Sequence, residues 1–279
     1  MVNPQHPYFD TERPAILAHR GSTEPAQSNT IDAFIDAVLR GATHIETDAR
    51  ASRDGIAVLV HDPTLVLHGK EIRVNTTNSD VLAALDLGAG QGLPSLANAL
   101  AALPTARFNI DVKSGDAIYP VAKAVVDAGA QHRVLITSFS SSRRRSTIRA
   151  IHRLMEHAGV RHMPSKDSPD GGETLRTASS AGGAEVLMTL IAMRVGLGRI
   201  AFRYLAKRID AFQVPERAAG MTVASRKFID LAHRYGMHMH VWTINDRPIF
   251  ESLRALGVDG FTTDSVQTAV DVLRKGKAV

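Results

Sequence analysis

Two histidines and several charged side chains follow short apolar runs in the first half of this 279-residue chain. His19 and Arg20 follow the run AILA, and about 30 residues later Glu46, Asp48 and His61 occupy similar settings. Cleavage of a phosphodiester needs one group to deprotonate a nucleophile and another to protonate the leaving alkoxide. A single histidine at a strand end more often has a structural role, but two beside carboxylates predict that His19 and His61 divide the acid and base roles.

Three carboxylates are spaced so that they would converge. Side chains two residues apart on a strand point to the same face, so Glu46 and Asp48 would project together, as would Asp111 and Lys113 on a later strand. Crowded carboxylates raise one another's pKa unless a cation neutralises them, and their oxygens suit Mg²⁺ or Ca²⁺. Glu46, Asp48 and Asp111 are therefore predicted to bind a divalent metal, although each alone is compatible with a salt bridge or a turn cap.

Two cations accompany these carboxylates. The transition state of phosphodiester cleavage gathers negative charge on the non-bridging oxygens, which fixed positive charges stabilise. Arg20 offers a planar fork for two phosphate oxygens and Lys113 offers a point charge. Both are predicted to bind phosphate, and the alternative is that they pair with the neighbouring carboxylates.

Short β-like runs alternate with helical patterns along the whole chain. In residues 29–41, for example, apolar residues recur at the spacing of one helix face and Gly41 supplies a stop. This alternation yields eight strands, and the residues named above would lie at strand ends. It predicts an α/β fold, a TIM (β/α)8 barrel, rather than an open doubly wound sheet. The runs are AILAH (15–19), HIETDA (44–49), RFNIDVK (107–113), RVLITSF (133–139), RHMPS (161–165), DAFQVP (210–215), MHMHVWT (237–243) and DGFTTD (259–264).

The length suits one barrel domain. Because the chain contains no linker, low-complexity tract or fixed-period repeat, residues 1–279 are predicted to form a single domain with insertions at about 62–95 and 164–209. Asp54-Gly55 is a strong hairpin turn signal, so the run IAVLV should return the chain, and His61 with it, toward the barrel mouth.

Composition excludes several classes of protein. The absence of cysteine leaves oxygen or imidazole to bind any metal, and the N-terminal sequence lacks the pattern of a secretion signal, which favours the cytoplasm. The longest apolar stretch, residues 184–193, is too short to span a bilayer. Aromatic residues make up 5% of the chain and no nucleic-acid-binding module is present, so nucleic acid is not an expected partner.

Two further segments allow two interpretations each. Residues 186–208 mix apolar residues with arginines, which would suit a membrane surface and a lysophospholipid substrate, or else an outer barrel helix with its arginines outward. His238 and His240 imitate a metal-binding histidine pair, but they are in phase with Trp242 and lack accompanying ligand motifs. Buried core histidines are the favoured interpretation.

Taken in order, AHRG, SNT, GATHIETDARASRDGIAVLVHD, NIDVK, TSFS, VWTIND and GVDGFTTD resemble the glycerophosphodiester phosphodiesterase family across nearly the whole chain. The resemblance implies a barrel of the phosphatidylinositol-phospholipase-like type, a divalent metal and a small glycerophosphodiester substrate. It implies the following roles: His19 and His61 as the acid/base pair, Glu46, Asp48 and Asp111 as metal ligands, Arg20 and Lys113 as phosphate contacts, and Trp242 as an aromatic side chain near the substrate.

The reaction that the resemblance implies is attack by the substrate's glycerol hydroxyl on phosphorus. A cyclic phosphate forms and water then opens it, which gives an alcohol and glycerol 3-phosphate. The chain departs from the family pattern at Ser28, in the stretch PTLVLHGKEI after Asp62, and at Asp111, where glutamate is usual. Two alternatives stay open: a lysophospholipase D-like or cyclic-phosphate-forming phospholipase, and a catalytically silent barrel that binds phosphate esters. The oligomeric state is also open.

Overall fold

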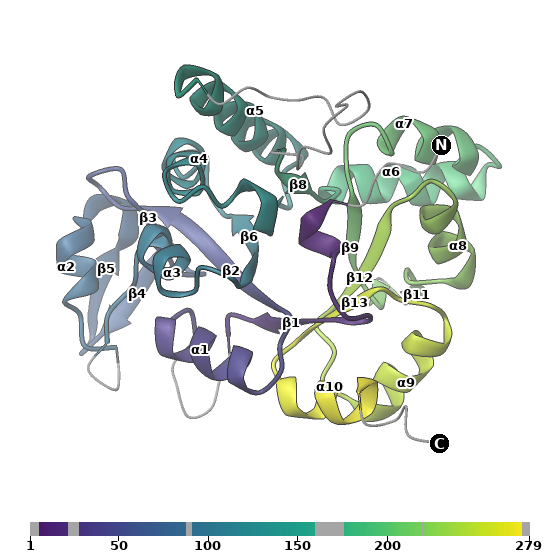
Figure 1. Ribbon diagram of the computed structural model, residues 1–279, viewed down its shortest axis with the longest axis horizontal. Coiled ribbons are helices and arrows are strands. Elements are labelled where there is room, and N and C mark those ends of the chain that lie inside the picture. Colours follow the sequence, from purple (N-terminus) through teal and green to yellow (C-terminus); the bar gives the residue numbers. More distant parts are fainter. Residues whose placement is uncertain (1–5, 22–27, 88–90, 160–175, 219, 275–279) are drawn as a thin grey trace.

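Eight parallel strands form a nearly closed barrel in this protein, whose structure is a computed structural model (Figure 1). The strands are β1 (Ala15–His19), β2 (His44–Ala51), β6 (Arg107–Val112), β7 (Val134–Thr137), β8 (Ala178–Ser179), β9 (Ala211–Pro215), β12 (His238–Trp242) and β13 (Gly260–Thr263). They neighbour one another in chain order, and one bridge between Ser180 and Ala211 joins β8 to β9. The predicted TIM barrel is confirmed. The structure describes residues 6–21, 28–87, 91–159, 176–218 and 220–274.

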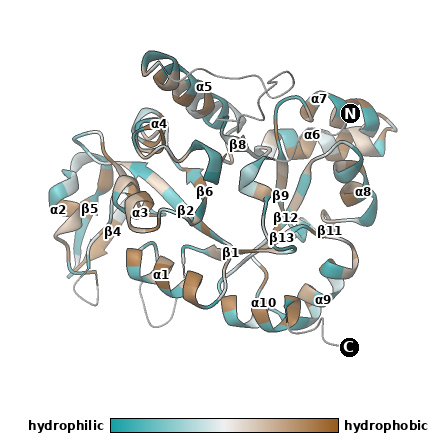
Figure 2. Ribbon diagram, in the orientation of Figure 1, coloured by the Kyte–Doolittle hydropathy of each residue, from teal (hydrophilic) through white to brown (hydrophobic). Residues whose placement is uncertain are grey.

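Helices surround the strands, and several begin where the sequence supplies a capping side chain. Thr30, Ser95, Ser140 and Ser225 each accept a hydrogen bond from a backbone N–H of the first turn. In Figure 2, helices such as α1 and α10 carry both hydrophobic and hydrophilic residues, as expected of helices that cover a sheet. The helices around the barrel are α1 (Ile31–Leu39), α3 (Leu96–Ala102), α4 (Ile118–Asp127), α5 (Ser141–His157), α6 (Gly183–Arg194), α7 (Gly198–Leu205), α8 (Arg226–Arg234), α9 (Arg247–Ala255) and α10 (Val266–Leu273).

One barrel strand differs from the sequence prediction. Residues 161–165, predicted as the fifth strand, lie outside the described residues, and the position between β7 and β9 is taken by Ala178–Ser179 instead. A strand of two residues within the sequence RTASSA has no apolar alternation, so its pattern gives no strand signal.

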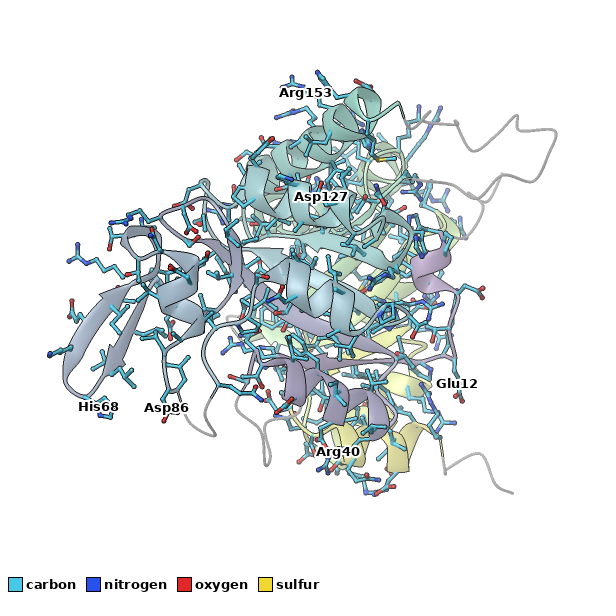
Figure 3. The ribbon with its side chains drawn as sticks, turned by 60° about the vertical axis from the view of Figure 1, so that its left-hand side comes forward. Glu12, Arg40, His68, Asp86, Asp127 and Arg153 are labelled. Atoms are coloured by element: carbon cyan, nitrogen blue, oxygen red, sulfur yellow. The ribbon has the colours of Figure 1, made fainter. Side chains whose placement is uncertain are left out.

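The predicted hairpin and the first predicted excursion are both present. β2 pairs antiparallel with β3 (Ala57–Leu59), and Gly55 has the positive φ that the turn between them requires. β4 (Thr64–Leu67), β5 (Lys70–Arg73) and α2 (Ser79–Ala83) then enclose a small apolar cluster of their own. In Figure 3 this excursion projects from the barrel, with His68 at the opposite side of the view from Glu12.

The described part of the second predicted insertion contains β8, α6 and α7, so residues 186–208 form two helices rather than one. A two-stranded sheet of β10 (Arg217–Ala218) and β11 (Met221–Thr222) follows β9. Within the described ranges, no helix has the length and apolar character needed to cross a bilayer.

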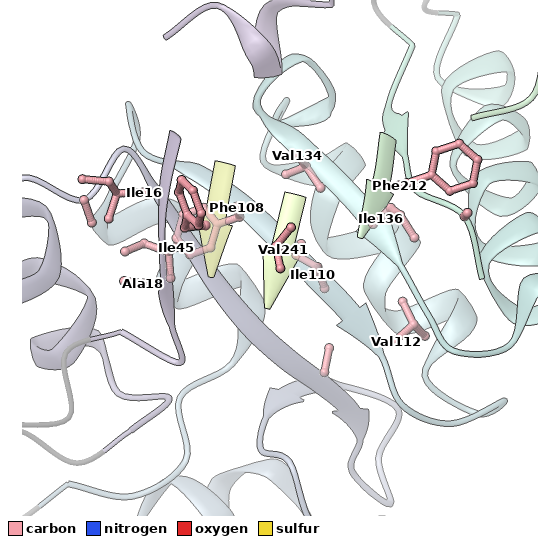
Figure 4. Close-up of a cluster of buried hydrophobic side chains, with 14 of the residues drawn as sticks. Ile16, Ala18, Ile45, Phe108, Ile110, Val112, Val134, Ile136, Phe212 and Val241 are labelled. Carbon is pink, nitrogen blue, oxygen red and sulfur yellow. The ribbon is translucent and has the colours of Figure 1, made fainter. Parts of the chain in front are cut away.

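Side-chain alternation on the strands separates two environments. Ile16 and Ala18 of β1 point outward into the core between strands and helices, as do Ile45, Ile110 and Val241 from other strands (Figure 4). The residues between them point into the barrel, because successive side chains on a strand face opposite sides. The outer core therefore holds the strands in place while the barrel interior is free to carry polar groups.

The N-terminal end of the barrel is plugged by the short helix η1 (Pro7–Phe9). The Phe9 ring stacks on His238 with 3.9 Å between centroids, and His44 Nε2 lies 3.0 Å from the Tyr8 carbonyl. Burial lowers the pKa of His44 and of His240 to about 3, so both are neutral. His240 is thus a buried group of the barrel interior, as the favoured interpretation has it, and His238 beside it is half-buried under Phe9.

Arg133 provides hydrogen-bond donors for backbone carbonyls that are buried beside the core. Arg133 is 6% exposed, and its guanidinium donates to the carbonyls of Leu100 and Leu103 at the end of α3 and of Ala106 just before β6. Arg133→Met should lower the free energy of unfolding by about 2 to 4 kcal/mol, because buried acceptors lose their donor. Urea unfolding measures the change.

The matched control is Arg226→Met, which removes an exposed ion pair to Asp230 one helical turn away. That change should alter the free energy of unfolding by less than about 1 kcal/mol. Equal losses for the two variants would show that the hydrogen bonds of Arg133 contribute nothing beyond a surface charge.

Candidate active site

A cavity of about 550 Å³ opens at the C-terminal ends of the barrel strands. The strand register brings its polar residues together, since His19 pairs with Glu46 on the next strand and Asp48 pairs with Asp111 on the one after. All eight of the residues predicted from sequence line this cavity: His19, Arg20, Glu46, Asp48, His61, Asp111, Lys113 and Trp242.

His19, at the end of β1, is oriented by a carboxylate. Its Nδ1 lies 2.7 Å from Asp264 Oδ1, and Asp264 Oδ2 accepts a hydrogen bond of 2.8 Å from Asn245. The pKa of Asp264 is lowered, mainly by the hydrogen bond from His19. Burial opposes this effect, and the hydrogen bond from Asn245 adds to it. With Nδ1 bound to a carboxylate, Nε2 is left to face the cavity, 3.9 Å from Glu46.

Asp264 and Asn245 were not among the residues predicted for the site. The sequence does contain a signal for Asp264, because this residue directly follows the last barrel strand, β13. That strand pairs with β1 through Ala18 and Thr263. In a closed barrel the last strand lies beside the first. A carboxylate at the end of β13 must therefore lie near His19, although 245 residues separate the two in sequence.

Asn29 is a third residue that the sequence prediction did not assign. It is buried with a φ of 60°, a conformation that asparagine tolerates better than most residues. Its Oδ1 accepts from Thr47 at 2.7 Å and its Nδ2 approaches Asp48 at 3.4 Å. Asn29 therefore helps to orient Asp48 from the loop before α1.

His61 reaches the cavity just after β3, which continues along the edge of β2 that β1 occupies at Glu46. The Val60 N–H donates to the Asp48 carbonyl at 2.9 Å, and Arg50 Nε donates to the His61 carbonyl at 2.8 Å. Its Nδ1 lies 2.9 Å from Asp62 Oδ1. The hairpin thus carries His61 back to the rim, as its turn signal predicted.

The two cations predicted to bind phosphate contact carboxylates here. Lys113 Nζ lies 2.7 Å from both Asp48 Oδ1 and Asp111 Oδ2, and Arg20 Nε lies 2.9 Å from Asp48 Oδ2. Burial alone would raise the pKa of Asp48, but Lys113 and Arg20 outweigh it and lower that pKa. Asp111 and Asp48 in turn raise the pKa of Lys113, although the burial of Lys113 would by itself lower it.

The negative charge of Glu46 and Asp111 is less well compensated. Burial, reinforced by Asp48 and Asp111, raises the pKa of Glu46 well above its usual value, and burial also raises that of Asp111 in spite of Lys113. Asp111 Oδ1 is buried without a hydrogen-bond partner. This corner of the cavity therefore has an excess of carboxylate oxygen.

In the part of the chain that the structure describes, no three acidic or histidine side chains already form a metal-binding group. Instead, the ammonium of Lys113 lies between Asp48 and Asp111. The donor chemistry nevertheless fits a divalent cation, since carboxylate oxygens are the ligands that Mg²⁺ and Ca²⁺ prefer. The partnerless oxygen of Asp111 and the raised pKa of Glu46 both mark where positive charge is lacking.

Part of the cavity is aromatic and aliphatic, and Phe139 connects this part to the charged part, since Lys113 Nζ lies 5.9 Å from the centroid of its ring. Trp242, at the end of β12, meets Phe139 with the rings 6.0 Å apart and inclined at 72°. Val186, Leu187 and Leu190 of α6 also line this part. A ligand in the cavity would therefore contact charged groups on one side and apolar groups on the other.

Comparisons with known proteins agree with this arrangement. A sequence profile of the glycerophosphoryl diester phosphodiesterase family matches residues 19–268. A probable glycerophosphodiester phosphodiesterase 2 from Mycobacterium tuberculosis is 36% identical over 262 residues, which cover 92% of this chain and 89% of that protein. The sequence match thus extends over almost the full length of both chains.

Solved structures share the fold at lower sequence identity. A glycerophosphodiester phosphodiesterase from Parabacteroides distasonis has a TM-score of 0.67 and 21% identity, over 95% of this chain and 99% of that one. A phosphodiesterase from Oleispira antarctica, solved with its product sn-glycerol-3-phosphate, has a TM-score of 0.66 and 19% identity, over 94% and 97%. The predicted family resemblance and enzyme class, a phosphoric diester hydrolase, are confirmed. The chain belongs to the glycerophosphoryl diester phosphodiesterase family.

Proposed function

We propose that this enzyme hydrolyses glycerophosphodiesters to an alcohol and glycerol 3-phosphate with the aid of a divalent cation, Mg²⁺ or Ca²⁺. The observation that carries the proposal is the convergence of two histidines, three carboxylates and two cations on one cavity. Hydrolysis of a diester needs an acid, a base and compensation of phosphate charge, and this cavity offers all three.

Glu46, Asp48 and Asp111 would hold the cation, which when bound supplies charge neutralisation and polarisation at the phosphoryl oxygens. Arg20 and Lys113 extend the positive potential from there toward a bound phosphate. Because both cations already pair with Asp48, they hold their positions before the substrate arrives and need little reorganisation.

His19 and His61 act as the acid and base. One takes the proton of the substrate's glycerol hydroxyl as that oxygen attacks phosphorus, and the other gives a proton to the departing alkoxide. A cyclic phosphate forms, and water opens it with the proton transfers reversed. Asp264 fixes the His19 tautomer so that Nε2 serves the reaction.

Incubation with glycerophosphocholine and Mg²⁺ or Ca²⁺, followed by ³¹P NMR, tests the proposal. Glycerol 3-phosphate should appear, and excess EDTA should abolish its formation because the three carboxylates would lose their cation. A cyclic ester that persists would indicate a phospholipase that stops at the first step. An unchanged diester would indicate a silent barrel, and full activity in EDTA would refute the metal assignment.

His19→Ala and His61→Ala should each lower kcat by about 10²-fold or more, since each removes a proton-transfer group. Steady-state kinetics with glycerophosphocholine measures the loss. His157→Ala is the control, because His157 is exposed at the end of α5 and outside the cavity. If either cavity variant turned over like the His157 control, that histidine would have no part in proton transfer.

Asp264→Asn tests Asp264 as a positioning residue. Loss of the carboxylate beside Nδ1 should lower kcat at least about 10-fold with little change in KM, because the neutral amide no longer fixes the tautomer or stabilises imidazolium. The pH profile of kcat should also shift. Asp230→Asn on α8 is the matched control and should retain wild-type kinetics; an Asp264 variant that did the same would remove the pairing from the mechanism.

A further inference from the structure

The catalytic cavity has two chemically different halves. The acidic residues that line it, Glu46, Asp48 and Asp111, all lie on β2 and β6. Among its described lining residues, the opposite half has no carboxylate. We call this half the apolar wall; it consists of Val186, Leu187, Leu190, Ala218 and Trp242, and Phe139 lies between it and Lys113.

Helix α6 supplies the central part of the apolar wall, and it does so with side chains that the fold does not need to bury. Val186 and Leu190 pack partly against the core beneath the helix. Leu187, in contrast, is 59% exposed and still lines the cavity. Met188 and Ile191 are also exposed, so the apolar surface continues outward along the helix. A single exposed leucine needs no explanation, but a continuous apolar surface beside a ligand cavity is typical of a binding site.

The position of α6 is set by a buried ion pair. Arg144 of α5, 1% exposed, donates to both carboxylate oxygens of Glu185 at 3.0 and 3.2 Å, and to Ser179 at 3.1 Å. Glu185 in turn accepts from the Gly182 N–H at 2.9 Å. Because the N-terminal turn of α6 is held this firmly, the apolar wall is formed before any ligand binds.

An aliphatic chain is the ligand group that suits such a wall. A small cationic head group would gain no ion pair there, because the carboxylates are on the other half of the cavity, and its attraction would be limited to the ring of Trp242, whereas the aliphatic residues of α6 would leave it without a partner. The aliphatic part of a glycerophospholipid is its acyl chain, on the glycerol arm. The proposed reaction needs a free hydroxyl next to the phosphorylated carbon, which leaves room for one chain at the far carbon and none for a second.

We propose that the apolar wall binds a single acyl chain on the glycerol arm of the substrate, so that lysophospholipids are substrates of this same site. The inference rests on the proposed phosphodiester hydrolysis and specifies its substrate class. The chain would lie over Leu187 and leave the phosphate among Arg20, Lys113 and the carboxylates.

The test is a series of 1-acyl-glycerophosphocholines with 4, 6 and 8 acyl carbons, each below its micelle-forming concentration, beside unacylated glycerophosphocholine. Product formation is followed by ³¹P NMR. Wild-type kcat/KM should rise with chain length, by roughly 10-fold or more from 4 to 8 carbons, because each CH₂ covered by apolar surface adds binding free energy. Leu187→Asp should flatten this rise, and Leu187→Met should restore it.

Leu39→Asp is the matched control, because Leu39 is an 80% exposed leucine on α1 that does not line the cavity. It should leave the chain-length dependence as in wild type. A flat series in wild type, with glycerophosphocholine still hydrolysed, would overturn the acyl-chain assignment alone. If no diester were hydrolysed, glycerophosphocholine included, the proposed function itself would fail.

A second series distinguishes the two arms of the substrate. In glycerophospho-n-alkanols of 2 to 8 carbons the chain is on the head-group arm. A rise in kcat/KM with this chain length, and none with acyl length, would assign the apolar wall to the leaving alcohol and overturn our proposal. A rise confined to the acyl series supports it.

Discussion

The site depends on the ammonium of Lys113, which lies between two buried carboxylates. Asp48 and Asp111 are both almost fully buried, and a buried charge is costly unless it is paired and hydrogen-bonded. Lys113 contacts both at 2.7 Å, and Arg20 adds a second positive charge at Asp48. Without these partners the carboxylates would take up protons, and the cavity would lose the charge that makes it a candidate for binding a metal and a phosphate.

This pairing follows from the register of two neighbouring strands. Asp48 on β2 pairs directly with Asp111 on β6, and Lys113 lies two residues beyond Asp111 on the same face. A slip of β6 by one residue would turn Asp111 and Lys113 into the outer core and would turn Ile110 and Val112 into the barrel. The apolar residues that pack under the helices therefore also select the register on which the charged residues depend.

The same alternation explains how much could be predicted from sequence. Seven of the eight strands contain runs with a readable apolar pattern, and their polar end residues were identified because chemistry in a parallel barrel gathers at those ends. The strand at Ala178–Ser179 is too short to show a pattern. Asp264 was missed because its role requires barrel closure, which places the last strand next to the first. Which partners Lys113 and Arg20 take was left open, since spacing alone cannot choose between a phosphate and a carboxylate.

Closure of the barrel also allows the proposed catalysis and the proposed substrate recognition to be separated in one cavity. Charged groups on β1, β2 and β6 must keep the register that balances their charges, so few substitutions are compatible with them. The apolar wall opposite comes largely from α6, which is attached through the Arg144–Glu185 pair outside the cavity. A change at Leu187 therefore alters which groups a ligand can bury without disturbing any buried charge. If the proposed function holds, strand register would set the phosphate chemistry and one helix would set the choice of substrate.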